Sequence, residues 1–470
     1  MSNLNQIAWE TLFKRYKILE EVDKNGIFYI SADQIKKERE PRLMAKFDHT
    51  INLPPIFAKN KLSILPITRG DYAIAHFDAY HPFEDAILEC KNIKQTCSGV
   101  GFYNSPTIQS QMQRKFYPLN VLGHGYNPEI HQVSMPSYIQ SIDSNNITSE
   151  TVALNCAVAT GIIADFTEDF NILPTVSGRM GSGYFNFNIK DVITKKTLNI
   201  DVKNSQIEID AAYEGVNYLS LFEAKRDISD DFLVRQLYYP YRSWQGQVTK
   251  PVKPIFLVYS NGIYRLYEYR FTNPDEYSSL TLVKQKNYSI EDTEITTEDI
   301  INVMKNTKIK AEPSGVPFPQ ADKFERIINL CELLNSGDYD RNQVTQNYDF
   351  DGRQTNYYIS AGIYLGLIEK YQINRSYQLS KDGKKILKLN YKQRQLAYCE
   401  RILSHNVFHK VAQLYFQRGN IPERSEVIDI MKSFDLYNVK AESTYFRRSS
   451  TVMSWVEWIA KLIQSKILNF

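Results

Sequence analysis

The alternation of apolar and polar residues predicts two neighbouring β-strands near the middle of the chain. In residues 206–210 two isoleucines alternate with two acids, and in residues 219–225 leucines share alternate positions with Glu223 and Lys225. Because successive side chains of a strand point to opposite faces, the isoleucines should enter a core while Asp210 faces the other way. Two carboxylates and one ammonium group can therefore converge where the two strands meet.

Helix and turn signals frame this strand pair on its N-terminal side. Ser149 is placed to cap an Ala-rich helix over residues 152–166, with Glu150 in a first turn where the helix dipole favours an acid. The glycine-rich residues 177–183 predict a turn, because they do not lie between a strand and a helix as a nucleotide-binding fingerprint requires. Alternating aromatic residues over 184–189 then predict a half-buried strand.

A helix is also predicted after the second strand. Ser229 is a suitable N-cap, the helix carries Gln236, and Pro240 should kink or end it. The continuously apolar residues 254–260 predict a central strand, and an Asn-Gly pair supplies the positive φ angles of a type I′ turn to a partner strand over 263–271. The middle of the chain is therefore expected to be an α/β core.

The first 146 residues predict an α+β region. A helix with apolar residues at helical spacing should stop at Asn25-Gly26, and residues 53–56, 65–70 and 72–77 are typical of short strands with turns. Basic residues here are candidates for DNA contact, although a surface loop whose charges pair with one another is the favoured explanation. These residues are Arg39, Arg42, Lys46 and Arg69.

Residues 311–319, rich in Pro and Gly, predict a linker to a helical C-terminal part. Helices are predicted there over residues 324–334, 342–348 and 353–367. Two short strands and a basic helix follow, and this order resembles a winged-helix module, whose second helix commonly enters the major groove of DNA. Helices over 422–433 and 443–458 suggest a second such unit.

Composition is typical of a globular protein in a reducing compartment. The 470 residues correspond to about three domains. The 5 cysteines are scattered without CxxC pairs, and no apolar run approaches the roughly 18 residues of a membrane span. We therefore expect a soluble, cytoplasmic protein without disulfides.

Positive charge is concentrated near the C-terminus. The net charge is only +3, but residues 371–420 carry 10 Lys or Arg against 2 Asp or Glu. Contacts from Lys and Arg to phosphates supply most non-specific nucleic-acid affinity, so this segment is a candidate landing surface. Solvated helix faces also accumulate lysines, so the charge alone leaves both interpretations open.

The acids of the central strand pair are suited to metal-dependent hydrolysis. Asp210 and Glu223 offer oxygen ligands to Mg²⁺, which keeps water molecules for chemistry, and Lys225 can orient the attacking water or offset charge on a phosphate. A Glu-x-Lys sequence is common on exposed strands. Here the strand is otherwise apolar, so burying both charges would be costly without partners or a metal.

This order of an Asp, a gap and then Glu-x-Lys resembles the PD-(D/E)xK nuclease superfamily over about residues 150–271. Ile209 stands where the motif has Pro, and Pro240 stands where a Gln-Leu-x-x-Tyr helix motif of some of these nucleases has Tyr. A helix that begins near Glu150 often lends an acid to such sites, although capping explains Glu150 as well.

The resemblance implies a set of functional residues. The implied ligands of Mg²⁺ are Asp210, Glu223 and the Ala224 carbonyl. Mn²⁺ is expected to be able to replace Mg²⁺. Lys225 is the residue implied to position the water or the scissile phosphate, and Gln236 is implied to support the site.

The resemblance also implies an architecture and an activity. The expected fold is multidomain α/β: an N-terminal α+β region (1–146), a restriction-endonuclease-like α/β/α nuclease domain (147–310), a linker (311–322), a winged-helix module (323–390) and a second helical module (391–470). The implied activity is that of a type II restriction endonuclease, a hydrolase that cuts double-stranded DNA at specific sequences and leaves a 5′-phosphate.

Partners and contact residues follow from this resemblance. The chain is expected to act in a bacterial cytoplasm on DNA, beside a separately encoded DNA methyltransferase. Cutting both strands with one active site per chain implies either a homodimer on DNA or sequential nicking. The residues expected to contact DNA are Arg353, Gln354, Asn356, Tyr357, Lys381, Lys384, Arg447, Arg448 and Arg42.

Three other interpretations remain open at this point. A repair or modification-dependent nuclease on the same fold would act only on damaged or methylated DNA. A winged-helix regulator with a decayed nuclease domain would bind DNA without cutting it. A carboxylate-pair hydrolase acting on sugars would not need the basic C-terminal segment.

Overall fold

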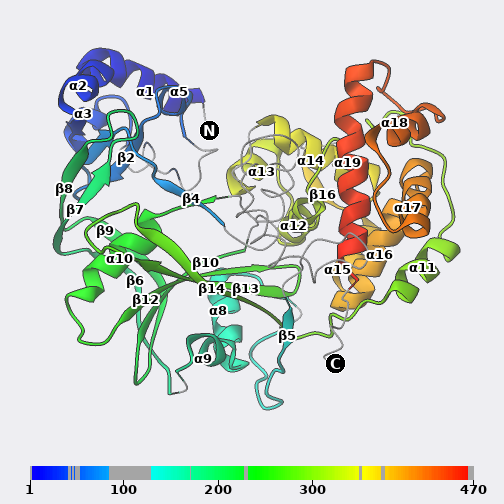
Figure 1. Cartoon of the computed structure of the whole chain (residues 1–470), viewed down its shortest axis with the longest axis horizontal. Coiled ribbons are helices and arrows are strands. Elements are labelled where there is room, and N and C mark those ends of the chain that lie inside the picture. The colour runs from blue at the N-terminus through cyan, green and yellow to red at the C-terminus, as the bar shows by residue number, and fades with distance from the viewer. Residues whose placement is uncertain are drawn as a thin grey trace, which may run out of the picture. The chain divides into compact units, whose positions relative to one another are not determined.

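The computed structural model divides the chain into two compact units (Figure 1). The first consists of Met1–Phe83, Met135–Tyr259 and Tyr264–Tyr288, and the second of Glu84–Ser134, Ser260–Ile263 and Ser289–Phe470. The structure describes residues 3–40, 44, 47, 53–83, 129–144, 146–169, 171–226, 231–348, 352–371 and 376–463. The N-terminal segment therefore folds in one unit with the central strand pair.

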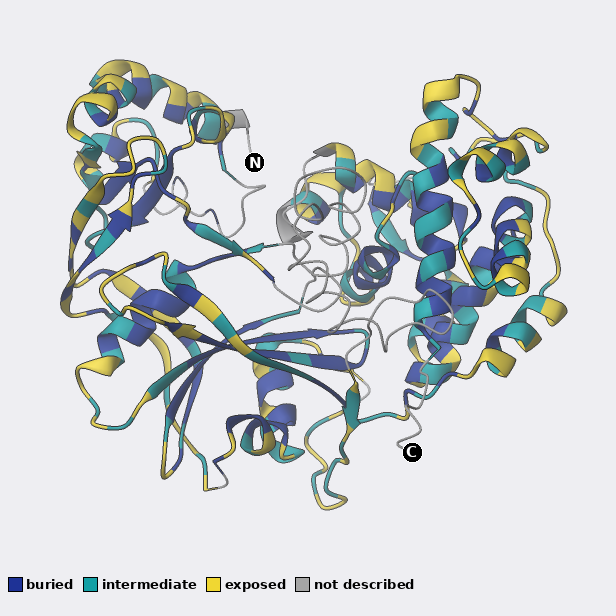
Figure 2. Ribbon diagram, viewed as in Figure 1, coloured by how far each residue is buried: buried dark blue, intermediate teal, exposed yellow. Residues whose placement is uncertain are grey.

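A seven-stranded mixed sheet is central to the fold, with strand order β5-β14-β13-β12-β10-β9-β6. In that order the strands are β5 (Ile130–Gln132), β14 (Leu280–Ser289), β13 (Ile263–Phe271), β12 (Val252–Ser260), β10 (Leu219–Lys225), β9 (Gln206–Glu214) and β6 (Leu173–Gly181). β10 is parallel to β12 and antiparallel to β9. Figure 2 shows both β10 and β12 buried along most of their length, so the predictions of two adjacent strands and a central apolar strand are confirmed.

Helices pack on the strands that carry the candidate acids. α8 (Glu150–Ala159) and α10 (Arg235–Gln245) both contact β9 and β10, and Figure 1 shows them on either side of the sheet. The Ser149 hydroxyl accepts a hydrogen bond from the Val152 amide at 3.1 Å, which confirms the predicted N-cap. The sheet and its helices thus bring the N-terminus of α8 and the first turn of α10 to the same strand pair.

Two local predictions in this unit are wrong, and a third is met only in part. The helix expected over 152–166 is broken at Gly161, whose φ is +77°, and continues as α9 (Ile162–Thr167). Of the two outcomes predicted for Pro240, a kink or an end of the helix, the end is excluded, because Pro240 lies inside α10. The glycine-rich residues expected to form a turn are part of β6 as far as Gly181, because they pair with β9 through two register shifts.

Further predictions concern the residues around α10 and the hairpin. The prediction that Ser229 caps the helix is wrong, because Val234 is the N-cap of α10 and the short strand β11 (Asp231–Leu233) precedes it. Ser229 itself lies outside the described residues. The Asn-Gly turn between β12 and β13 has φ angles of +54° and +78°, as the type I′ prediction requires. A two-stranded sheet of β7 (Tyr184–Lys190) and β8 (Thr197–Lys203) confirms the half-buried strand over 184–189.

The N-terminal segment folds as helices around a three-stranded sheet of order β1-β3-β2. Its elements are α1 (Asn3–Tyr16), α2 (Ile18–Asn25), β1 (Ile27–Ile30), α3 (Ala32–Lys36), α5 (Pro55–Lys59), β2 (Ser63–Pro66), β3 (Tyr72–Ala75) and β4 (Tyr80–Pro82). The stop at Asn25 is confirmed, since Gly26 follows with a φ of +80°. The strand expected over 53–56 is wrong: Pro55 begins a helix, a position where its fixed φ is favourable.

The second unit is mainly helical. Its further elements are α11 (Thr297–Asn306), α12 (Phe324–Asn335), α13 (Arg341–Tyr348), α14 (Gly352–Tyr364), β15 (Ile368–Lys370), β16 (Tyr377–Leu379), α15 (Lys381–Leu387), α16 (Tyr391–Leu403), α17 (Asn406–Arg418), α18 (Arg424–Lys432) and α19 (Glu442–Lys461). β15 and β16 pair antiparallel, as predicted. α14 ends earlier than residue 367, because Gly366 adopts a φ of +69°.

In the described part of the chain, no helix is long and apolar enough to cross a membrane. The cysteines of this part, Cys156, Cys331 and Cys399, are buried and free, so none of them forms a disulfide.

The turn between β9 and β10 is held by one buried carboxylate. Asp169 accepts hydrogen bonds from the backbone amides of Val216, Asn217 and Tyr218 at 2.9–3.1 Å. A Cβ added at Gly215 would lie only 2.3 Å from an Asp169 carboxylate oxygen. The turn that aligns the two acid-bearing strands therefore requires glycine at this position.

We expect Gly215→Ala to lower the free energy of unfolding by about 1–3 kcal/mol, because Asp169 cannot move without losing its hydrogen bonds. Calorimetric unfolding of the full chain measures this change. Gly246→Ala is the matched control, since its Cβ would meet nothing within 4 Å. Equal unfolding midpoints for the two variants would contradict this account of the turn.

Candidate active site

The candidate site forms where β9 separates from β10. Their pairing runs from Leu219 opposite Glu214 to Phe222 opposite Ala211 and then stops, while β9 stays paired with β6. One residue further along β9, the Asp210 carboxylate accepts a hydrogen bond from the Ala224 amide at 2.8 Å. A side chain thus replaces the ladder bond, and it directs the Asp210 carboxylate toward the end of β10.

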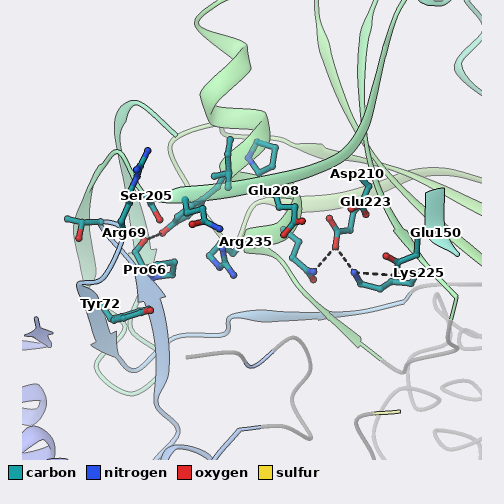
Figure 3. Close-up of a pocket in the computed structure, with 16 residues that line it drawn as sticks. Pro66, Arg69, Tyr72, Glu150, Ser205, Glu208, Asp210, Glu223, Lys225 and Arg235 are labelled. Carbon is teal, nitrogen blue, oxygen red and sulfur yellow. Dashed lines mark hydrogen bonds and ion pairs between the residues drawn. The ribbon is translucent and has the colours of Figure 1, made fainter. Parts of the chain in front are cut away.

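Glu223 is at the centre of a polar cluster (Figure 3). Its side chain lies almost wholly inside the protein, and the residue is only 7% exposed. One carboxylate oxygen accepts hydrogen bonds from Lys225 Nζ and from Gln236 Nε2, both at 2.7 Å. The Glu150 carboxylate lies 3.9 Å from Lys225 Nζ. The structure therefore brings together Asp210, Glu223, Lys225 and Gln236, with Glu150 at the edge.

The electrostatics of the cluster reflect burial and an excess of carboxylates. Burial raises the pKa of Asp210, and burial together with the nearby acids raises the pKa of Glu223 to about 7, although Lys225 opposes the shift. Burial lowers the pKa of Lys225, but the charges of Glu223, Glu150 and Asp210 outweigh it and raise that pKa. Lys225 therefore stays charged, and the cluster carries more negative than positive charge when all its acids are ionised.

This donor set fits a hard divalent cation. Within the described ranges no group of three or more His, Cys, Asp or Glu side chains is arranged to hold a metal. Mg²⁺ is usually bound by one or two carboxylates and keeps several water molecules, so the pair of Asp210 and Glu223 is sufficient. Burial is the main cause of the raised pKa of both acids, and a bound cation would lower these pKa values because it favours the ionised carboxylates.

Gln236 has the geometry of a residue that orients Glu223. Its Nε2 donates to the Glu223 carboxylate, and its Oε1 is buried without a hydrogen-bond partner among the described residues. A buried acceptor without a donor is unusual, and a water molecule in the site would satisfy it. The side chain of Ala224 is fully buried, so only its backbone is available to the site.

The cluster lines an open pocket of about 420 Å³ that also reaches the N-terminal segment (Figure 3). Its lining includes Arg69 and Tyr72 from the region of β2 and β3, and Arg235 at the start of α10. The sequence identifies Arg69 as a candidate DNA contact in a basic cluster, but it identifies neither Tyr72 nor Arg235. A signal for Arg235 was its place beside Gln236, whereas the sequence near Tyr72 carries none.

The predicted DNA-contact residues lie at several places. On α14, Arg353, Asn356 and Tyr357 are exposed and share one face, while Gln354 is partly buried. Lys381 and Lys384 are exposed on α15. Contact between these residues and DNA remains a prediction, because the structure contains no DNA. Arg42 and Lys46 lie outside the described residues, and Arg39 hydrogen-bonds Asn5.

Arg448 is the most unusual of these basic residues. Its Nε and Nη1 atoms are buried and have no hydrogen-bond partner among the described residues. Burial and the neighbouring Arg447 lower the pKa of Arg448, and Tyr357 of α14 is the other group that acts on it. The structure thus brings Arg448 of α19 close to the exposed face of α14, and no acid in the described part of the chain forms an ion pair with its guanidinium group.

Comparison with protein families finds three matches, each to a domain of unknown function. DUF6996 matches residues 6–74, DUF6997 matches residues 116–289 and DUF7226 matches residues 326–464. No curated protein and no solved structure matches the chain. The candidate acids and Lys225 lie within the second of these ranges, and Arg69 lies within the first.

We expect the affinity for Mg²⁺ to rise as the pH increases through about 7, because Glu223 must lose its proton before it can bind a cation. Below its pKa the fraction of ionised Glu223 falls about tenfold for each pH unit, and affinity should fall with it. Calorimetric titration of the chain with Mg²⁺ on either side of neutrality measures this change.

The matched control for the pH dependence is Glu208→Gln, since Glu208 also lines the pocket but is exposed and pairs with Arg179 at 3.1 Å. This variant should keep the pH dependence, whereas Glu223→Gln should lose it together with most of the affinity. Binding by the Glu223 variant that equals wild type would rule out Glu223 as a ligand.

Proposed function

We propose that the chain is a Mg²⁺-dependent nuclease that hydrolyses phosphodiester bonds in double-stranded DNA, in the manner of a type II restriction endonuclease. The observation that carries this proposal is the cluster of Asp210, Glu223 and Lys225 on two strands that separate at that point. The sheet with α8 and α10 packed on β9 and β10 supports a restriction-endonuclease-like α/β/α core.

The chemistry assigns a role to each side chain. Mg²⁺, when bound, would polarise the phosphate and lower the pKa of a coordinated water. Asp210 and Glu223 would hold the ion, and the Ala224 carbonyl is the proposed third protein ligand. Asp210 is kept in position by the Ala224 amide, and Gln236 keeps Glu223 in position. Lys225, charged at neutral pH, would orient the attacking water or neutralise charge on the scissile phosphate.

The second unit supports DNA as the substrate. The order of three helices, α12 to α14, followed by the β15–β16 pair fits a winged-helix module. Tyr339 adds a further β-bridge to Tyr377 of β16. The exposed face of α14 would then lie in the major groove. Arg448 beside that face suits a backbone phosphate, because its Nε and Nη1 atoms are buried and have no hydrogen-bond partner among the described residues.

We expect Asp210→Asn and Lys225→Ala to reduce DNA cleavage by about a thousandfold or more, because each removes a group that acts on the reacting phosphate. Both variants should bind a duplex oligonucleotide in Ca²⁺ with nearly wild-type affinity. Cleavage is measured on plasmid DNA with Mg²⁺, and binding by fluorescence anisotropy. Lys203→Ala, an exposed lysine on β8, is the matched control and should cut normally.

Arg448→Ala gives the reciprocal control. This variant should weaken duplex binding and lower its salt dependence by about one phosphate contact, while Mg²⁺ binding is unchanged. Lys440→Ala, an exposed lysine in the same unit, should change neither quantity. A Lys225 variant that still cuts DNA would disprove the site assignment. Normal binding by the Arg448 variant would remove this residue from the DNA interface.

A further inference from the structure

The pocket that holds the candidate catalytic cluster has a second end with the opposite charge. Figure 3 shows Glu150 and Lys225 at one end, Arg69 and Tyr72 at the other, and Arg235 between them. The acidic end suits a cation. The basic end suits an anion, and both ends belong to one continuous space within the first unit.

The basic end is held rigidly on the core, although its wall comes from the N-terminal segment. Tyr239 of α10 donates a hydrogen bond from its hydroxyl to the Pro66 carbonyl at 3.0 Å. The Lys203 amide of β8 donates to the Ile67 carbonyl at 2.8 Å. These bonds fix the turn between β2 and β3 against the elements that flank the catalytic strands. A residue on this turn can therefore act on a substrate bound at the acidic end.

Among the described residues, the acids near the basic end have partners other than its two arginines, and Glu208 of the pocket lining pairs with Arg179. Asp71, the carboxylate nearest in sequence to Arg69, accepts hydrogen bonds from the Ala32 amide at 2.9 Å and from the Thr68 hydroxyl at 3.0 Å. Arg235 stacks near the Tyr239 ring, with 5.8 Å between its guanidinium carbon and the ring centroid. Among the residues that the structure describes, neither Arg69 nor Arg235 forms an ion pair with a carboxylate. Two guanidinium groups thus line the pocket with donors available to a ligand.

We propose that Arg69 and Arg235 form a phosphate subsite, which binds the backbone phosphate next to the one that lies over Asp210 and Glu223. This inference rests on the proposed nuclease function for the position of the scissile phosphate. Guanidinium groups match the geometry of phosphate oxygens, and the Tyr72 hydroxyl adds one more donor to the same wall. A nucleic-acid strand presents phosphates in regular succession, so it can occupy both ends of the pocket at once.

The subsite gives the N-terminal segment a role in binding substrate. Arg69 lies in the region matched by DUF6996, and Arg235 lies in the region matched by DUF6997. Residues from two regions that match different domain families would therefore bind the same phosphate. Replacing either arginine should shift the bound DNA strand relative to Asp210 and Glu223 and weaken the binding of DNA.

The test is the salt dependence of binding to a labelled duplex oligonucleotide, measured by anisotropy in Ca²⁺, which does not depend on cleavage. The slope of log affinity against log salt should fall by about 1 in the double variant Arg69→Gln with Arg235→Gln, because one phosphate contact is lost. Each single variant should give a large part of this loss, since both arginines act on the same phosphate. Arg69→Gln alone keeps the test valid if Arg235→Gln fails to fold.

Arg270→Gln is the matched control, because Arg270 is an exposed arginine of the same unit that does not line the pocket. A slope and affinity equal to wild type in the double variant would overturn the subsite, as would an equal loss in the Arg270 variant. So would a wild-type chain that does not bind the duplex. If wild type binds but does not cut with Mg²⁺, and the arginine variants still lose slope, the nuclease proposal fails while the phosphate subsite stands.

Discussion

The candidate site depends on one substitution of a side chain for a backbone group. Where β9 leaves β10, the Asp210 carboxylate takes the hydrogen bond of the Ala224 amide, which a continuous ladder would have given to a carbonyl. A buried amide without a hydrogen-bond partner would lower the free energy of unfolding by about 1–3 kcal/mol. The bond to Asp210 avoids this loss where the strands separate. It also holds one acid beside Glu223, and the pocket opens at the point where the ladder ends.

Charge at this point is balanced only in part. Glu223 is buried at 7% exposure and shares one oxygen between Lys225 and Gln236, yet Asp210 and Glu150 add further negative charge. Burying ionised groups costs several kcal/mol unless they are compensated. A divalent cation would supply that compensation, which connects the raised pKa of Glu223 to the proposed chemistry. Without a bound cation, the partly compensated charge of this cluster should lower the stability of the chain.

Local patterns predicted the elements of the site but not its full extent. Alternation identified β9 and β10 with the correct faces, because a strand buries every second residue whatever its partners. The turn predicted from the glycine-rich residues before Gly181 is wrong, because pairing with β9 overrides the preference of glycine for turns. Pro240 stays within α10, where packing outweighs a lost backbone bond. The sequence near Tyr72 did not indicate the pocket. There, residues around Tyr72 meet residues of β9 and α10 that lie more than 100 positions later in the chain, and such a long-range approach leaves no periodic pattern in the sequence.

We propose that the separated strands carry a working Mg²⁺-dependent phosphodiesterase site. The most direct measurement is to incubate the purified wild-type chain with unmethylated phage DNA, with Mg²⁺ or with EDTA, and to separate the products on a gel. The account predicts discrete bands in the Mg²⁺ lane and intact DNA in the EDTA lane, with fragment ends that map to one sequence. Intact DNA in both lanes, together with a clear mobility shift, would contradict it and indicate a protein that binds DNA without cutting it.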